Sequence, residues 1–150
     1  MTMRICGVEL KGSEAIICLL SYQDGLFSIP ECRVRKVEFN KQNRTGDIQY
    51  FQATFAKLIE DYKIDKVVIK ERPLKGKFAG GALGFKMEAA IQLIKDVDTQ
   101  VITAVEFKEA IKRNPVTVAF EETGLKIFQK SAFEIAYAIH MNIVYGHDEN

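Results

Sequence analysis

The chain has 150 residues, of which 47% are hydrophobic and 27% charged, the composition of an ordinary globular protein with one domain and a proper core. Its 21 basic and 20 acidic residues give a net charge of +1, which excludes the global basic excess of many nucleic-acid-binding proteins. No run of about 18 apolar residues occurs and the N-terminus lacks a hydrophobic signal core, so we expect a cytoplasmic protein without membrane contact.

The first part of the chain predicts an antiparallel meander of strands. Residues 3–10 alternate loosely between apolar and polar side chains and end at a turn over residues 11–13. Residues 15–22 form the second predicted strand. A third strand is expected within residues 27–39, interrupted or bulged near Pro30, because proline cannot donate to the ladder.

Helices and strands then alternate. The first predicted helix has one apolar face, which comprises Ile48, Phe51, Phe55, Leu58, Ile59 and Tyr62. The second opens at Gly80 and Gly81, and its apolar face comprises Leu83, Met87, Ala90, Ile91 and Ile94. Strands are predicted at residues 65–71 and 101–105.

The last part of the chain predicts two further helices, at residues 106–113 and 126–141. Residues 116–120 are short and apolar without a decisive period, so their structure stays open. A strand–helix–strand unit that follows a meander indicates a mixed sheet with helices on its faces.

The cysteines and histidines show no spacing typical of a site. Cys6, Cys18 and Cys32 lack a Cys-x-x-Cys pair, and His140 and His147 lie far from them in sequence. We expect the cysteines to be small buried hydrophobes in a reducing compartment and predict no zinc site.

Three glutamates stand where a carboxylate is costly. Glu9 ends the apolar run 5–8, Glu71 ends the run 67–70, and Glu134 lies within an apolar helical segment. Carboxylates rarely occupy such surroundings unless they are paired or bind a cation. If the fold brings the three together, their mutual repulsion favours a divalent metal, which predicts metal-dependent chemistry.

The alternation of side chains along a strand suggests how two of the glutamates meet. Gly7 and Glu9 share one face of the first strand, and Ile69 and Glu71 share one face of the fourth. If these strands are parallel neighbours, both carboxylates emerge at the carboxyl edge, where open α/β sheets hold ligands. Gly7 would leave space beneath the site for a close backbone approach. The alternative is that each glutamate merely ends its element in solvent.

These segments resemble the ribonuclease H-like superfamily, particularly its Holliday-junction resolvase (RuvC-type) branch. Residues 7–12 are similar to its first acidic strand and turn, residues 67–73 to its strand-borne glutamate, and residues 130–139 to its final helix. The resemblance implies one ribonuclease H-like domain over residues 1–150 with a five-stranded mixed sheet. Three antiparallel strands would be followed by alternating helix and strand, with helices on both faces.

Two departures from this family pattern concern the acids. The resolvase branch usually has aspartate in the first strand, whereas Glu9 sets its carboxylate one methylene further out. Ser131 stands where a second helical acid is usual and can serve only as a weak, neutral ligand. Two metals about 3.5–4 Å apart would therefore need help from substrate phosphates. We predict Mg²⁺ or Mn²⁺ at Glu9, Glu71 and Glu134, because oxygen ligands suit hard cations.

A basic, glycine-rich segment surrounds Glu71 and is predicted to contact the phosphates of a nucleic acid. Its cations are Lys70, Arg72, Lys75, Lys77 and Lys86. Phe78 is suited to stacking on a base, as in single-strand-binding proteins. A solvated loop explains the same composition equally well.

The function predicted from these features is that of a metal-dependent nuclease acting on structured or single-stranded nucleic acid. Glu9 and Glu71 would bridge two metals and Glu134 would complete the ligand shell for phosphodiester hydrolysis. The alternative is a catalytically degenerate ribonuclease H-like module that binds nucleic acid or a protein partner, since folds outlive activities. Whether the chain forms a homodimer is left open.

Overall fold

The computed structural model describes residues 2–72 and 81–146. In chain order its elements are β1 (Thr2–Lys11), β2 (Glu14–Gln23), β3 (Leu26–Ser28), β4 (Lys36–Glu38), α1 (Thr45–Asp61), β5 (Lys66–Lys70), α2 (Ala82–Gln92), β6 (Asp98–Ile102), α3 (Ala104–Arg113), the 3₁₀ turns η1 (Phe120–Glu122) and η2 (Ile127–Gln129), and α4 (Lys130–Val144). None of the helices in these two stretches is long and apolar enough to cross a membrane.

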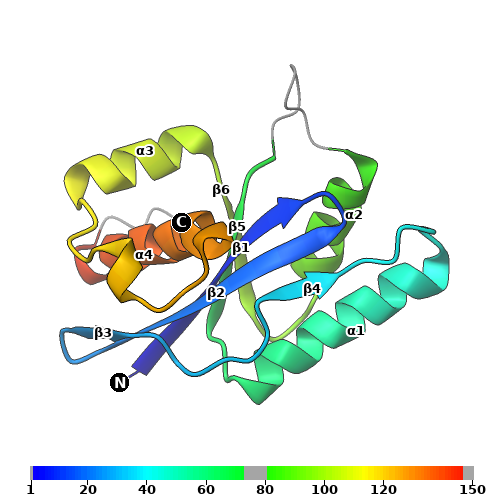
Figure 1. Cartoon of the computed structure of the whole chain (residues 1–150), viewed down its shortest axis with the longest axis horizontal. Helices are drawn as coiled ribbons and strands as arrows, with labels where there is room; N and C mark the ends of the chain where they lie inside the picture. The colour runs from blue at the N-terminus through cyan, green and yellow to red at the C-terminus, as the bar shows by residue number, and fades with distance from the viewer. Residues whose placement is uncertain (1, 73–80, 147–150) are drawn as a thin grey trace.

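The strands form a mixed sheet in the order β3-β2-β1-β5-β6, with β4 also paired to β2. β1 runs antiparallel to β2 and parallel to β5, and β5 runs parallel to β6 (Figure 1). The prediction of a mixed sheet in which the first strand lies beside the strand after the first helix is therefore confirmed.

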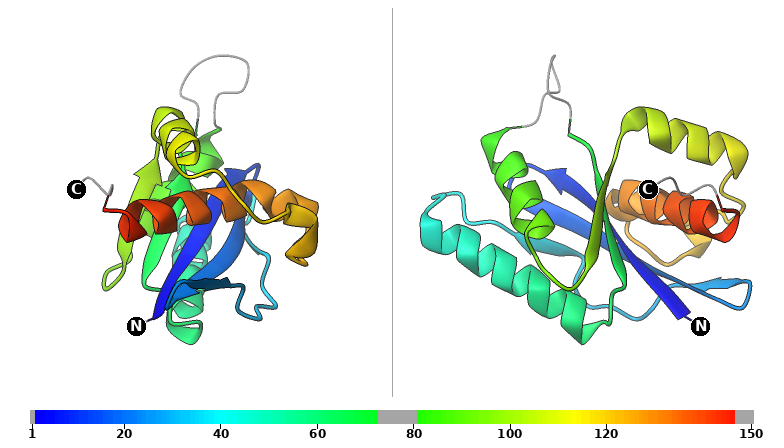
Figure 2. Two further views of the ribbon diagram at one scale, coloured as in Figure 1. Left: turned by 90° about the vertical axis from the view of Figure 1, so that its left-hand side faces the viewer. Right: turned by 180° about the vertical axis from the view of Figure 1, so that it is seen from behind.

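Helices cover both faces of the sheet, α1 and α2 on one side and α3 and α4 on the other (Figure 1). The β1 side chains alternate accordingly: Cys6, Val8 and Leu10 pack in the core beneath α1 and α2. Ile5 packs in the second core, beneath α4. Figure 2 shows α4 crossing the long strands β1 and β2, which it contacts directly. Two apolar cores therefore hold the sheet between helical layers.

The third predicted strand is divided in two. β3 pairs with the end of β2 and β4 with its beginning, and Pro30 lies in the connection between them. A proline cannot supply the N–H that an unbroken strand would need there. The interruption predicted near Pro30 is confirmed.

Both predicted ends of one strand are corrected. The strand expected at residues 101–105 is β6, which begins at Asp98 and ends at Ile102. It ends there because Thr103 caps α3: its side chain accepts a hydrogen bond from the Glu106 amide, and the Glu106 carboxylate accepts one from the Thr103 amide. The open segment 116–120 forms no regular element before the turn at Phe120.

The expectation that the cysteines are small buried hydrophobes holds for the two that lie in the sheet. Cys6 and Cys18 are buried and free. Burial raises the pKa of the Cys6 thiol well above its ordinary value and that of Cys18 to about 12. Both therefore stay protonated and behave as small apolar side chains.

Candidate functional site at the carboxyl edge of the sheet

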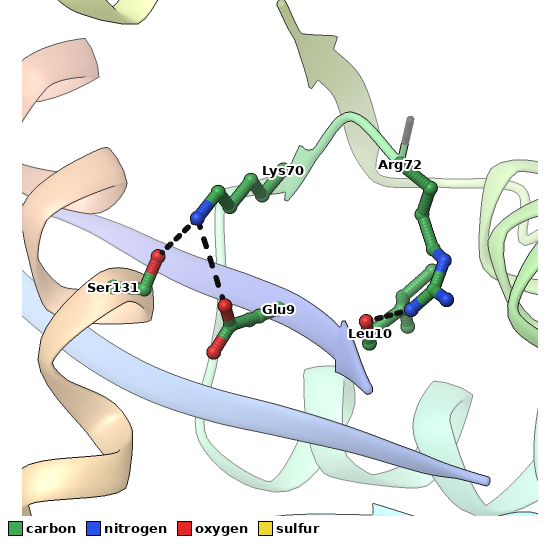
Figure 3. A network of polar contacts seen from close by, with 5 residues as sticks. All are labelled: Glu9, Leu10, Lys70, Arg72 and Ser131. Carbon is green, nitrogen blue, oxygen red and sulfur yellow. Dashed lines mark hydrogen bonds and ion pairs between the residues drawn. The ribbon is translucent and has the colours of Figure 1, made fainter. Parts of the chain in front are cut away.

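The candidate site lies where β1 and β5 end beneath the start of α4. Lys70 stands at its centre, with Glu9 on β1 and Ser131 on α4 around it (Figure 3). The Nζ atom of Lys70 lies 3.6 Å from Oε2 of Glu9 and donates a hydrogen bond of 2.9 Å to Oγ of Ser131. One ammonium group therefore joins two strands and a helix.

The register of the parallel strands explains why Glu9 meets a lysine. Val8 pairs with Ile69, so the next residues along the two strands are Glu9 and Lys70. Both lie on the face covered by α4, because side chains alternate and Val8 and Ile69 pack on the opposite face. The side chain of Glu9 is 24% exposed and that of Lys70 is 47% exposed.

Gly7 decides how closely α4 approaches this pair. A Cβ atom on Gly7 would collide with the backbone carbonyl of Ala132 and press on the side chain of Ala136. The sequence predicted a close backbone approach at Gly7, and the backbone that approaches is that of α4. Ser131, which precedes Ala132, is thereby held over the carboxyl edge.

Glu71 leaves the sheet on the other side, toward α2. Its amide still donates to the carbonyl of Ile102, and its carboxylate lies close enough to Glu88 of α2 to affect it. Burial raises the pKa of the Glu88 carboxyl, the negative charge of Glu71 raises it further, and Arg72 lowers it. The expectation that Glu9 and Glu71 emerge side by side is therefore wrong, because Lys70 takes the place beside Glu9.

Arg72 belongs to the same group of charged side chains as Glu71 and Glu88. Its Nη1 atom donates a hydrogen bond to the carbonyl oxygen of Leu10, as Figure 3 shows. Its Nε atom is buried and has no partner among residues 2–72 and 81–146. The guanidinium group passes over Gly84 of α2, where a Cβ atom would collide with it. Arg72 also lines an open pocket of about 420 Å³ between the β1–β2 turn and the start of α2.

Glu134 is half-buried on α4, one turn after Ser131. Within residues 2–72 and 81–146 its carboxylate forms neither a hydrogen bond nor an ion pair. Across the same residues no three Asp, Glu, His or Cys side chains are arranged to hold a metal ion. The expected convergence of Glu9, Glu71 and Glu134 on one point is thus not found.

The residues present do not fit a two-metal centre. The carboxylate of Glu9 is neutralised by a lysine, and Glu71 lies toward another helix. The assignment of Mg²⁺ or Mn²⁺ to Glu9, Glu71 and Glu134 stays a prediction from the sequence.

The three predicted phosphate contacts that the structure describes are engaged within the protein. Lys70 and Arg72 hold the partners described above, and the Lys86 ammonium donates to the side chain of Asn43 at 2.8 Å. The other predicted contacts lie outside the described residues and are Lys75, Lys77 and Phe78. Alternation of side chains within each strand does not predict the pairing of Glu9 with Lys70, because it leaves the stagger between the two strands open.

Two solved structures share this fold along their whole length. The first is "Thermus thermophilus RuvC structure", with a TM-score of 0.73 and 12% identity, covering 96% of this chain and 97% of that one. The second is "T. thermophilus RuvC in complex with Holliday junction substrate", with a TM-score of 0.71, 12% identity and 96% coverage of both chains. At such identity the likeness concerns the fold alone, and the chain has the ribonuclease H-like fold predicted for it.

The sequence itself assigns the family. Residues 3–139 match the family described as "Protein of unknown function (DUF3010)", and the chain belongs to this family. No curated protein matches the sequence.

Proposed function

We propose that this chain is a nucleic-acid-binding protein of ribonuclease H-like fold that contacts its ligand through the carboxyl edge of β1 and β5. The observation that carries the proposal is Lys70, a cation at this edge whose side chain is 47% exposed while Glu9 and Ser131 hold it in place. A phosphate oxygen is a suitable additional acceptor for its ammonium group, which offers three donors.

The similarity in fold supports the class of ligand. One of the two matching structures is that of T. thermophilus RuvC in complex with a Holliday junction substrate, and the match covers 96% of each chain. With a net charge of +1, the chain has no general attraction for phosphates, so binding depends on local cations such as Lys70.

Hydrolysis is the second candidate function. It is favoured by the likeness in fold to RuvC and by the three acids that the sequence proposes as ligands, Glu9, Glu71 and Glu134. It is disfavoured by the ion pair of Lys70 with Glu9, because a metal shared by those acids would first have to separate it. We therefore place binding before catalysis.

Binding is tested by fluorescence anisotropy with labelled four-way junction, duplex, RNA–DNA hybrid and single strand over a series of salt concentrations. We expect Lys70→Ala to weaken binding and to reduce the slope of log affinity against log salt by roughly one, the loss of one phosphate contact. Lys95→Ala is the matched control, since Lys95 is exposed in the connection between α2 and β6, at the opposite edge of the sheet. If the wild type binds none of the four ligands at low salt, the proposal fails.

The same ligands incubated with Mg²⁺ or Mn²⁺ separate binding from catalysis. Binding without cleavage, unchanged in Glu71→Gln, supports the module. Cleavage that disappears in both Glu9→Gln and Glu71→Gln would instead establish the nuclease predicted from the sequence.

A further inference from the structure

We propose that Lys70 is a built-in cation that takes the place of a divalent metal beside Glu9, so that the wild-type site holds no metal ion. The inference concerns the site of the proposed function, although it does not require that nucleic acid binds there. It follows from the geometry of Lys70, Glu9 and Ser131.

The ammonium group of Lys70 contacts both neighbouring side chains of the site. It lies between the carboxylate of Glu9 and the hydroxyl of Ser131, at 3.6 and 2.9 Å. These oxygens come from two different layers of the fold, the sheet and α4. A cation bound to Glu9 under α4 would therefore compete with Lys70 for the same oxygens.

The space around the Lys70 ammonium group cannot widen easily. The backbone of α4 rests on Gly7 without room for a Cβ atom, and Ser131 immediately precedes the contacting residue, Ala132. Side chains in such packed interfaces respond to added volume by strain and shifts rather than by expansion. A metal ion and the Lys70 ammonium are thus alternatives at this site.

Glu9 and Lys70 form a pair that is already neutral, and a divalent ion on Glu9 would stand within a few ångströms of a positive ammonium group. A single carboxylate with a serine hydroxyl is also a poor ligand set for Mg²⁺ or Mn²⁺, which bind several oxygens. Lys70 both fills the site and lowers its affinity for metal.

The lysine position can be converted to test this. Lys70 and Glu9 occupy neighbouring places on the same face of parallel strands, whose spacing is about 4.8 Å. Lys70→Glu therefore sets a second carboxylate beside the first, close enough to share one cation. For the wild type we expect no saturable Mn²⁺ binding at millimolar concentrations. The variant should bind Mn²⁺ with an affinity at least tenfold above whatever weak binding the wild type shows.

The experiment titrates Mn²⁺ into wild type, Lys70→Glu and Lys95→Glu, and follows free Mn²⁺ by its EPR signal together with the melting temperature. Lys95→Glu makes the same change in net charge at the opposite edge and should behave as the wild type. Nucleic acid is absent, so the result is independent of whether the proposed function holds. Circular dichroism checks whether each variant is folded.

A second variant keeps the test decisive if Lys70→Glu does not fold. Lys70→Gln removes the competing charge and adds an amide oxygen as a further ligand beside Glu9 and Ser131. Mn²⁺ should then raise its melting temperature although it leaves that of the wild type unchanged. Mn²⁺ binding by the wild type that disappears in Glu9→Gln would overturn the proposal. Folded Lys70 variants that bind Mn²⁺ no better than Lys95→Glu would overturn it as well.

Discussion

The backbone carbonyl of Ala132 on α4 occupies the space in which a side chain at Gly7 on β1 would begin. This contact joins the last helix to the central strand, two residues before Glu9 and one residue after Ser131. The polar cluster at the carboxyl edge thus depends on a glycine that takes no part in it.

Gly7→Ala should destabilise the protein by about 3 kcal/mol or more, because neither the strand nor the helix backbone can yield without disturbing the core. Urea unfolding followed by circular dichroism measures the change. The matched control is Gly46→Ala on α1, where an added Cβ atom meets nothing within 4 Å and the helix propensity of alanine should leave stability equal or slightly higher. Equal effects of the two substitutions would contradict the close packing at Gly7.

Gln129 replaces a missing strand partner in the sheet. Its buried Nε2 atom donates to the carbonyl of Ile17, which lies between the segments of β2 that pair with β4 and β3. Gln129→Met keeps the volume but leaves that carbonyl without its donor, so we expect a loss of about 1–3 kcal/mol in unfolding free energy. Gln49→Met, at an exposed position of α1, should cost little, and a similar loss there would argue against a specific role for Gln129.

His140 should make stability depend on pH. It is buried on α4 and its Nε2–H donates to the carbonyl of Leu20 at 2.6 Å, and burial lowers its pKa from the ordinary 6.5 to about 4. As pH falls below 6.5, the unfolded chain takes up a proton that the folded chain refuses. The titration of His140 should therefore lower the unfolding free energy as the pH falls from 6.5 to 4, by on the order of 3 kcal/mol in total. Below pH 4 this group should lower it no further.

Comparison with His140→Gln isolates this effect from the titration of the carboxylates. The glutamine offers an N–H donor but does not titrate, so the variant should lose stability less steeply between pH 6.5 and 4. Parallel curves for wild type and variant would show that His140 is not the titrating group.

Glu88 should make the opposite contribution. Because burial and the nearby charge of Glu71 raise its pKa, the folded chain binds a proton more tightly than the unfolded chain, and stability declines as pH rises through the window just above 4.5. Glu88→Gln removes this penalty. Its melting temperature should exceed that of the wild type by about 1–2 °C at pH 7 and match it at pH 4, since the side chain is partly exposed and the effect is screened.

The exposed Glu31 provides the comparison for this prediction. Glu31→Gln makes the same change in charge away from Glu71 and should leave the difference between the two pH values as in the wild type. An equal gain from both substitutions would show that net charge, rather than the proximity of Glu71, is responsible.

Much of the fold could be read from the sequence because periodicity is a local property. The apolar face of the first predicted helix, from Ile48 to Tyr62, and that of the second, from Leu83 to Ile94, both pack in the core as predicted. The break near Pro30 also followed from local chemistry. The start of β6 was missed, because Asp98, Thr99 and Gln100 are polar and only pairing with β5 makes them a strand.

The acidic site was predicted less well, for a physical reason. Alternation within each strand placed Glu9 and Glu71 correctly on faces of their own strands, but the relative stagger of two parallel strands is set by packing along the whole interface. A shift of one residue exchanges the faces. The sequence by itself thus determined the strands, helices and acids of this protein, whereas tertiary packing alone decided that Glu9 meets Lys70 and that Glu71 turns toward α2.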